Sequence, residues 1–269
     1  METGACAATS AGLGPALPPM AAGLNGAPAA SAGPDRPPAE TGLPVAVVVP
    51  VLDERENIAA VLASLAGRAA QVVVADGGSQ DGTPVLAQAH GAIVITSERG
   101  RAIQMNAGAA ALAPGWRVVL FLHADTRLPA DWSEAIGQAV RGGAQWGRFD
   151  VRLRSEHPLL RLVGAMMNAR SRLTGICTGD QAMFVTAPAW HRIGGFPAIE
   201  LMEDIAISAR LKRCAGRPAA LRAVVQVSAR RWERNGIWRT IGAMWILRLR
   251  YFLGEAPPSL HARYYGKPR

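Results

Sequence analysis

The sequence predicts an α/β fold built on one mostly parallel, doubly wound sheet. Between residues 45 and 125, short apolar runs alternate repeatedly with segments of helical spacing. Parallel strands covered on both faces read as continuous apolar runs, and each βαβ crossover needs a helix between its strands. Right-handed crossovers bring the carboxyl ends of such strands to one edge of the sheet. We therefore expect the polar turns after these strands to converge.

The first half of the chain gives the clearest pattern. Strands are expected at 45–51, 71–75, 92–96 and 118–122. The first is followed by a helix whose apolar positions are spaced three and four residues apart, namely Ile58, Val61, Leu62 and Leu65. No glycine-rich loop follows that strand, which excludes the usual dinucleotide-binding arrangement.

The second half is less regular. We expect helices at 131–141, 158–173 and 201–214 and strands at 147–154, 181–185 and 219–227. The strand at 147–154 alternates apolar and polar residues with a period of two, which predicts one face turned to solvent.

Composition divides the chain into three parts. Ala, Gly and Pro make up 26 of the first 43 residues, so a disordered tail is expected at 1–43. The α/β domain is expected at 44–235, and a basic C-terminal helix and tail at 236–269. From Ile205 onward the chain carries 14 Lys and Arg against two acidic residues, within a net charge of +9. Such a patch meets nucleic acid, an anionic membrane or a phosphorylated substrate, and charge alone does not choose among them.

Carboxylates stand at the ends of several expected strands. His123 and Asp125 follow the strand at 118–122, and because side chains alternate along an extended chain, both face the same way. Asp76 follows the second strand in a glycine-rich turn, and Asp53 follows the first. These residues fit a metal or phosphate site, but Asp and Gly also favour tight turns without any ligand.

These segments resemble the family 2 glycosyltransferases, whose single domain has the GT-A fold. The resemblance rests on motifs that occur in order along most of the chain. They are Val48-Val-Pro-Val-Leu-Asp-Glu54, Asp76-Gly-Gly-Ser-Gln-Asp-Gly-Thr83, Gly100-Arg-Ala-Ile-Gln-Met-Asn-Ala-Gly108, Phe121-Leu-His-Ala-Asp125 and Glu203-Asp204. The stretch Leu122-His-Ala-Asp-Thr126 resembles a subgroup of small bacterial transferases that has no secure acceptor.

The resemblance implies a role for each candidate residue. Asp125 matches the metal ligand for Mg²⁺ or Mn²⁺, and Asp204, with Glu203 beside it, matches the catalytic base. Hard divalent cations prefer such oxygen ligands. The remaining candidates are implied to bind the nucleotide sugar: Pro50, Asp53, Glu54, Asp76, Arg101, Gln104, His123, Arg231 and Trp232.

Two positions depart from the family pattern. His123 stands where the first acid of the D-x-D motif usually lies, and imidazole is a poorer Mg²⁺ ligand than carboxylate. Processive members of the family carry a Q-x-x-R-W motif. In this chain Arg231 and Trp232 match its last two residues, but Ser228 stands at the position of the glutamine, three residues before Arg231. We therefore expect transfer of a single sugar.

The helix expected at 237–253 is amphipathic, with two tryptophans on its apolar face and arginines on the other. It fits either a membrane interface or packing across the domain. A helix at the membrane interface would suit a lipid or carotenoid-like acceptor. It would also suit a cytoplasmic protein that is bound peripherally to the inner face of the membrane. No run of residues is long and apolar enough to span a bilayer.

The sequence therefore predicts an inverting, metal-dependent glycosyltransferase that uses a nucleotide sugar, with UDP as the expected carrier, and a hydroxyl or carboxyl acceptor. Two alternatives remain at this point: a nucleotidyltransferase on the same sheet, and a non-catalytic nucleotide-binding module. Nucleic-acid binding is not expected, because no recognisable module accompanies the basic charge.

Overall fold

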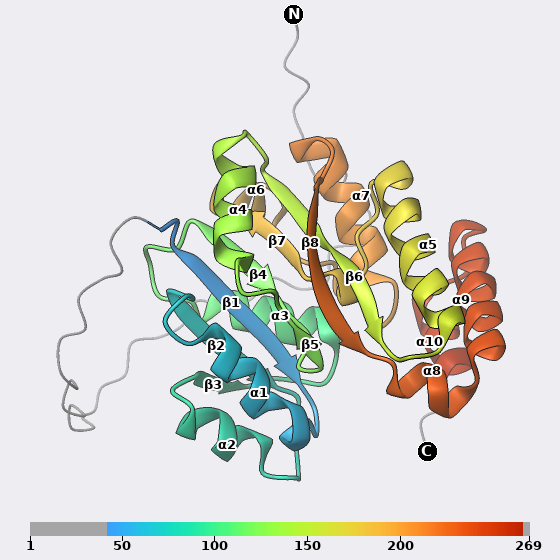
Figure 1. The fold of residues 1–269 in the computed structure, drawn as a ribbon, viewed down its shortest axis with the longest axis horizontal. Coiled ribbons are helices and arrows are strands. Elements are labelled where there is room, and N and C mark those ends of the chain that lie inside the picture. Colours follow the sequence, from blue (N-terminus) through green and yellow to red (C-terminus); the bar gives the residue numbers. More distant parts are fainter. Residues whose placement is uncertain (1–41, 266–269) are drawn as a thin grey trace, which may run out of the picture. The chain divides into compact units, whose positions relative to one another are not determined.

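The computed structural model describes residues 42–265, so the predicted tail lies outside the described part as far as residue 41. One sheet forms the centre (Figure 1). Its strands are β1 Val45–Val51, β2 Gln71–Asp76, β3 Ile93–Thr96, β4 Val118–Phe121, β5 Thr126–Arg127, β6 Trp146–Arg154, β7 Met183–Thr186 and β8 Ala219–Ser228. They stand in the order β3-β2-β1-β4-β7-β6-β8-β5.

The first four expected strands form a parallel set, as predicted. Strand β1 pairs with β2 on one side and β4 on the other, and β2 pairs with β3. The intervening helices are α1 Arg55–Leu65, α2 Thr83–Ala89 and α3 Arg101–Ala110. The buried residues of α1 are the four that its spacing predicted.

Strand β1 shows why both faces of the sheet must be covered. Its residues Val45, Val47 and Val49 pack into one core with α1, whereas Ala46 and Val48 pack into a second core with α3. All five are fully buried. A helix on each face therefore satisfies the uninterrupted apolar run that the sequence shows.

The second half of the sheet is mixed. Strand β7 is antiparallel to both β4 and β6, whereas β6 is parallel to β8. The helical elements here are α4 Trp132–Arg141, α5 Pro158–Thr174, the 3₁₀ turn η1 Gly179–Gln181, α6 Ala187–Ile193, α7 Glu203–Ala215, α8 Arg230–Asn235, α9 Ile237–Phe252 and α10 Pro257–Tyr265. Helix α6 has no counterpart in the sequence prediction.

Local sequence explains where α5 begins and ends. The His157 side chain accepts a hydrogen bond from the Leu159 backbone N–H, and Pro158 occupies the first turn, where its missing N–H costs nothing. Gly175 closes the helix with φ of +66°, a conformation that glycine adopts readily. The helix therefore has fixed ends beside the site described below.

The prediction of a solvent-facing side on β6 is wrong in part. Arg152 is exposed, but Arg148, which shares its face, is fully buried. The Arg148 guanidinium is ion-paired with Asp150 and donates to the Ser171 hydroxyl from Nε at 3.0 Å. Helix α5 covers this end of the strand, so the period-two pattern does not mark solvent here.

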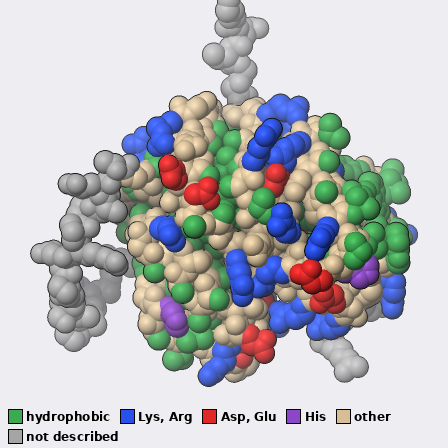
Figure 2. Space-filling view, in the orientation of Figure 1, with side chains coloured by type: hydrophobic (Ala, Val, Ile, Leu, Met, Phe, Trp, Pro, Cys, Tyr) green, Lys and Arg blue, Asp and Glu red, His purple; other side chains and the backbone are tan. Residues whose placement is uncertain are grey.

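The C-terminal segment forms two helices, α9 and α10, rather than the single helix expected (Figure 1). Leu247 and Leu260 pack with Leu201 and Ile205 in a small third core. On the opposite side of α9 the apolar side chains are exposed, and Figure 2 shows hydrophobic side chains gathered at the edge where this helix lies. The exposed residues of this apolar face are Trp238, Trp245, Ile246, Leu249, Phe252 and Leu253. None of the helices within residues 42–265 is long and apolar enough to cross a membrane.

Candidate active site

The turns after β1 and β2 are joined to each other by hydrogen bonds. The Asp53 backbone N–H donates to the Ser79 hydroxyl at 2.9 Å, and the Asp53 carboxylate accepts from the Gln80 N–H at 2.8 Å. Asp53 adopts φ of +54°, which is uncommon for a residue with a side chain. The predicted convergence of these two turns is therefore present in the fold, with Pro50 in the strand beside them, paired with Ala75.

Asp76 is almost completely buried at the end of β2. Its carboxylate accepts hydrogen bonds from the backbone N–H groups of Gly78 and Ser79 and from the Ser79 hydroxyl. Three donors from its own turn hold the side chain in place. Asp76 therefore shapes its own turn, and because three donors face about four lone-pair sites, its carboxylate has room for at most one further donor.

Gln104 holds the ends of β1 and β2 together. Its side-chain amide nitrogen donates to the backbone carbonyls of Val51 and Ala75, both at 2.8 Å, and the residue is buried. The resemblance implied that Gln104 contacts the nucleotide sugar. Because its amide N–H groups are already used by the two strands, the geometry favours a positioning role instead.

Glu54 lies where the two halves of the sheet meet. It accepts a hydrogen bond from the Asn57 amide at 2.7 Å, and the Arg230 guanidinium is 4.0 Å away. Burial raises the pKa of the Glu54 carboxyl above its ordinary value, and the charge of Asp125 adds to this effect. Glu54 therefore lies close enough to Asp125 for their charges to interact.

Asp125 follows β4 and is the predicted metal ligand. The one hydrogen bond to its carboxylate from residues 42–265 is long, at 3.5 Å from the Thr126 hydroxyl. Among those residues no group of three His, Cys, Asp or Glu side chains lies close enough to hold an ion by itself. A hard cation that takes its other ligands from a diphosphate fits this donor set, because it needs one protein carboxylate rather than a complete cage.

His123 lies against the η1 turn. Its Nδ1 atom is 3.6 Å from the Asp180 carboxylate, and the ring is so close to Gly179 that a Cβ there would meet it at 2.5 Å. Burial alone would raise the pKa of Asp180, but His123, Arg101 and Arg231 together lower it below its ordinary value. His123 is therefore paired with an acid rather than grouped with Asp125 as a second metal ligand.

The first turn of α7 presents two carboxyl groups. Asp204 accepts from the Gly179 backbone N–H at 3.2 Å and from the Ile205 N–H at 2.7 Å. Glu203 is buried, and its carboxylate is 4.0 Å from the Arg101 guanidinium. Burial, helped by the charge of Asp204, raises the pKa of Glu203 to about 7.

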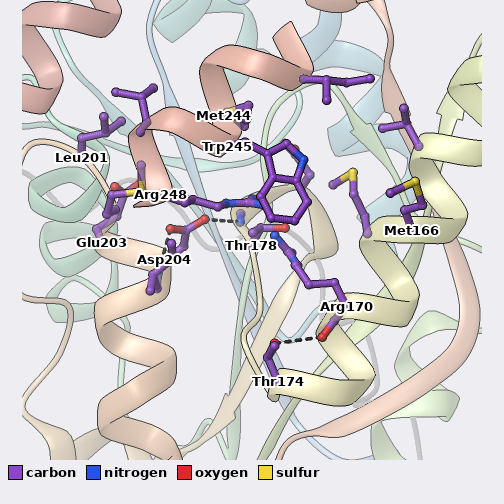
Figure 3. Close-up of a pocket in the computed structure, with 18 of the residues that line it drawn as sticks. Met166, Arg170, Thr174, Thr178, Leu201, Glu203, Asp204, Met244, Trp245 and Arg248 are labelled. Carbon is purple, nitrogen blue, oxygen red and sulfur yellow. Dashed lines mark hydrogen bonds between the residues drawn. The ribbon is translucent and has the colours of Figure 1, made fainter. Parts of the chain in front are cut away.

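These carboxyl groups line a cavity of about 440 Å³ (Figure 3). The fold brings together half of the predicted site residues in its wall, namely Arg101, His123, Glu203, Asp204, Arg231 and Trp232. The Arg231 guanidinium stacks on the Tyr264 ring, 4.5 Å from its centre. Trp232 is mostly buried in the core, so only its edge is available to a ligand.

The other predicted residues lie outside that cavity. They belong to the donor edge, which we define as the carboxyl ends of β1, β2 and β4 with Pro50, Asp53, Glu54, Asp76, Gln104 and Asp125. His123, which follows β4 and faces the cavity, connects the two. The site thus has two compartments, one built by hydrogen-bonded turns and one by a cavity.

Comparison with known proteins identifies the family of this chain. The model of the glycosyl transferase family 2 matches residues 46–185, more than half of the chain. The chain belongs to this family. Because it belongs to this family, the chain is a glycosyltransferase. The two alternatives from the sequence, a nucleotidyltransferase and a non-catalytic nucleotide-binding module, are therefore not supported. No curated protein matches the chain.

Solved structures show that this family 2 transferase has the GT-A fold. One is glucosyl-3-phosphoglycerate synthase from Mycobacterium tuberculosis in complex with phosphoglyceric acid, with a TM-score of 0.52 and 21% identity, covering 70% of this chain and 71% of that one. The same enzyme with Mn²⁺, UDP-glucose and glycerol 3-phosphate gives a TM-score of 0.51 at 20% identity, covering 70% and 71%. A mycobacterial protein is 22% identical over 70% of this chain, with a TM-score of 0.48. The chain spans 65% of its length, less than two thirds.

Sequence reasoning missed two arginines of the cavity of this transferase. Arg170 on α5 and Arg248 on α9 both line it. Arg170 lies within a helix that was expected from its apolar spacing, and no motif marks it.

Proposed function

We propose that this enzyme transfers a single sugar from a UDP-sugar to a hydroxyl or carboxyl group of an acceptor held in the cavity, with inversion at the anomeric carbon. The observation that carries the proposal is the placement of Asp204. Its carboxylate faces the cavity and is fixed by two backbone N–H groups, while Arg101 and His123 line the same space. A fixed base beside a ligand-sized cavity is what proton removal from an acceptor requires.

The donor edge suits the nucleotide. Asp76 is anchored by its own turn with room for one further donor, so it accepts a hydrogen bond from a base such as uracil. Pro50, Asp53 and Glu54 lie beside it and line the nucleoside side. Arg101 and Arg231 carry the positive charge that a diphosphate needs, and both face the cavity next to this edge.

Asp125 is the residue of this chain that would hold Mg²⁺ or Mn²⁺. When bound, such a cation supplies Lewis-acid stabilisation of the negative charge that develops on the departing nucleoside diphosphate. The glucosyl-3-phosphoglycerate synthase structures include complexes with Mn²⁺ and UDP-glucose and with Mg²⁺ and UDP.

Asp204 takes the acceptor proton. As the acceptor oxygen forms its bond to the anomeric carbon, the bond from that carbon to the diphosphate breaks, and the proton moves to an Asp204 oxygen. Attack from the face opposite the leaving group inverts the configuration. Glu203, buried behind Asp204, keeps a proton more readily than an ordinary carboxyl because its pKa is raised to about 7.

A thermal-shift screen of nucleoside diphosphates and nucleotide sugars, each with and without Mn²⁺, tests this proposal. UDP and UDP-glucose are expected to raise the melting temperature in the presence of Mn²⁺, since a ligand that binds only the folded state stabilises it. In the Asp125→Asn variant, the additional rise in melting temperature that depends on Mn²⁺ is expected to be lost. If no nucleotide stabilises the enzyme under either condition, the proposed function is wrong.

We also propose that the enzyme docks peripherally on a membrane through the apolar face of α9. Trp238 is 73% exposed, Phe252 68% and Leu253 77%. If this apolar face packed across the domain, which is the alternative to a membrane interface, these side chains would be buried. The C-terminal part also carries the excess of basic residues. Exposed aromatic side chains beside arginines fit an anionic bilayer interface, and a lipid or carotenoid-like acceptor would suit this position.

Sedimentation with vesicles tests the docking. Wild type is expected to sediment with vesicles that contain phosphatidylglycerol, and the double variant Trp238→Ser with Phe252→Ser is expected to remain in the supernatant. Val85→Ser on α2, which removes an equally exposed apolar side chain elsewhere (71% exposed), is the matched control. Equal sedimentation of wild type and the double variant would contradict the docking surface.

A further inference from the structure

Two arginines extend into the cavity from opposite walls. Arg170 comes from α5 and Arg248 from α9, and Figure 3 shows both reaching the space beside Asp204 and Thr178. Neither was marked by a sequence motif, and the mechanism above uses neither. Arginine presents a planar fork of donors that matches a carboxylate or a phosphate.

Two of the three nitrogen atoms of the Arg170 guanidinium are buried without a hydrogen bond. Nε and Nη2 are inaccessible to solvent and make no hydrogen bond with any part of the chain between residues 42 and 265. Burial, followed by the charge of Arg248, lowers the pKa of Arg170 to about 10. Burial also lowers the pKa of Arg248. Buried guanidinium N–H groups without acceptors are costly for the free protein, so an anionic ligand that accepts from them removes that cost.

The acids of the cavity offset its cations only in part. Asp204 attracts both arginines, but within residues 42–265 its carboxylate is hydrogen-bonded to backbone N–H groups and to neither guanidinium. Glu203 has a pKa of about 7 and is therefore only partly charged at neutral pH. Four guanidinium groups line the cavity against three carboxyl groups: Arg101, Arg170, Arg231 and Arg248 against Asp180, Glu203 and Asp204. Because Arg101 and Arg231 are the arginines proposed for the diphosphate, Arg170 and Arg248 are the cations left to bind an acceptor anion.

Most of the remaining wall is apolar. The side chains come from α5 and α9 on either side of the arginines, and they are Val163, Met166, Met167, Leu173, Ile241, Met244, Trp245 and Leu247. Three of these wall residues are also exposed at the surface, with Met166 at 53%, Trp245 at 60% and Leu173 at 78%. The cavity therefore opens through an apolar mouth that is continuous with the exposed face of α9.

We infer that Arg170 and Arg248 form an anion subsite, and that the acceptor is an amphiphile with a carboxylate or phosphate near its reactive hydroxyl and an apolar body. The anion lies between the two guanidinium groups, the apolar body lies against the methionines and Trp245, and the hydroxyl faces Asp204. In the transfer itself, the acceptor oxygen bonds to the anomeric carbon, the diphosphate leaves, and the proton goes to Asp204. This inference names the acceptor class of the proposed function and rests on it.

Titration calorimetry with simple amphiphiles tests the subsite without any sugar transfer. Decanoate and decyl phosphate, each below its micelle concentration, are compared with decanol and decylamine. The two anions are expected to bind at least about tenfold more tightly than decanol, because charge-assisted bonds to a buried guanidinium are strong. Decylamine is expected not to bind. Equal affinity for decanol and decanoate would overturn the inference.

Variants assign the effect to the arginines. Arg170→Gln and Arg248→Gln are each expected to weaken decanoate binding at least about tenfold and to leave decanol binding unchanged. Arg161→Gln is the matched control, since Arg161 is an exposed arginine on the same helix, paired with Glu156. Unchanged decanoate affinity in Arg170→Gln would overturn the inference. Because Nε and Nη2 of Arg170 make no hydrogen bond within residues 42–265, Arg170→Met is expected to melt no lower than wild type, whereas a merely structural arginine would cause a loss of stability.

Two further outcomes separate the possible failures. If decanoate and decyl phosphate do not bind, but phosphatidylglycerol vesicles bind wild type better than Arg170→Gln, the arginines recognise lipid headgroups and the inferred acceptor is wrong. If UDP with Mn²⁺ stabilises the enzyme while neither anionic amphiphile binds, this inference fails and the proposed function stands. If the amphiphiles bind and no nucleotide does, the proposed function fails and the anion subsite stands.

Discussion

The donor edge and the cavity differ in how their polar groups are satisfied. At the donor edge, Asp53, Asp76 and Gln104 all hydrogen-bond to backbone groups of neighbouring turns and strands. In the cavity, Glu203 is buried with a raised pKa, and the Arg170 guanidinium has buried nitrogen atoms without a hydrogen-bond partner in residues 42–265. The donor edge is held in place by hydrogen bonds from its own polar side chains. The cavity contains buried charged groups whose hydrogen bonds are incomplete.

This difference indicates a division of labour between the two regions. A nucleotide common to many family members suits a preorganised edge, because rigid hydrogen-bonded turns lower the entropic cost of binding. An acceptor differs from enzyme to enzyme, and a cavity of charged and apolar side chains is where such selectivity resides. Substitutions in the two regions should therefore have different signatures.

The largest effect is expected on turnover, from Asp204→Asn. Removal of the base is expected to slow sugar transfer by about 10²–10⁴-fold, which general-base catalysis typically contributes. The rate of sugar transfer is measured as the release of UDP from UDP-glucose, in the presence of an acceptor that supports turnover. UDP with Mn²⁺ should still stabilise this variant, because the donor edge is untouched. Full turnover would show that Asp204 is not the base.

Stability should depend strongly on the buried Arg148. Arg148→Ala leaves Ser171 without its partner and takes one of two cations from Asp150, so a loss of about 3–5 kcal/mol is expected in the free energy of unfolding. Arg152→Ala, on the same strand but exposed, should change it by less than about 0.5 kcal/mol. Urea unfolding of both variants measures the difference. Similar small changes in both would mean that the Arg148 network adds little.

Glu203 should make stability depend on pH. Its pKa is raised from 4.5 to about 7, so between these values the folded state binds more protons than the unfolded state. Stability is then lost as pH rises from about 4.5 through 7, by up to about 3 kcal/mol for a shift of this size. Urea unfolding of wild type and Glu203→Gln at pH 5 and pH 8 measures how much of the change in the free energy of unfolding comes from Glu203. A fall of equal size in the variant would show that other groups cause it.

Gln104→Leu tests the donor edge. The variant removes the side-chain donor to the carbonyls of Val51, which keeps the Gly77 N–H, and of Ala75, so a loss of about 1 kcal/mol is expected in the free energy of unfolding. Stabilisation by UDP should fall as well, because the ends of β1 and β2 lose their link. Gln88→Leu, an exposed glutamine on α2, is the control. Unchanged stability and UDP binding would show that the link is dispensable.

The smallest effect on folding is expected at the exposed face of α9. Trp238→Ser with Phe252→Ser should change the free energy of unfolding by less than about 0.5 kcal/mol per site, since both side chains are mostly exposed. Chemical denaturation without lipid measures this. A loss of several kcal/mol would show that the face is covered by packing, contrary to the docking proposal.

Much of the first half could be predicted from sequence because its signals are local. Apolar runs at β1, β2 and β4 require cover on both faces, and the spacing in α1 identifies its buried side. The position of Asp76 and Asp125 at strand ends follows from the parallel arrangement. Apolar character alone does not decide burial, since Val85 on α2 is 71% exposed.

The second half could not be predicted to the same depth because its decisive contacts join distant segments. The period-two pattern of β6 placed Arg148 in solvent, yet α5 covers it. Glu203 and Arg101 lie about a hundred residues apart in sequence and meet across the site. The two motifs after β1 and β2 gave no sign that Gln104 would join them.

The sequence by itself determined the α/β class, the positions of the parallel strands along the chain and the carboxylates at their ends, because hydrophobic period and turn chemistry act over a few residues. Only the tertiary structure decided that Arg170 and Arg248 meet beside Asp204 in an apolar cavity. Burial and the charges of other elements set the cost of a guanidinium there, and neither is a property of the residues next to it in the chain.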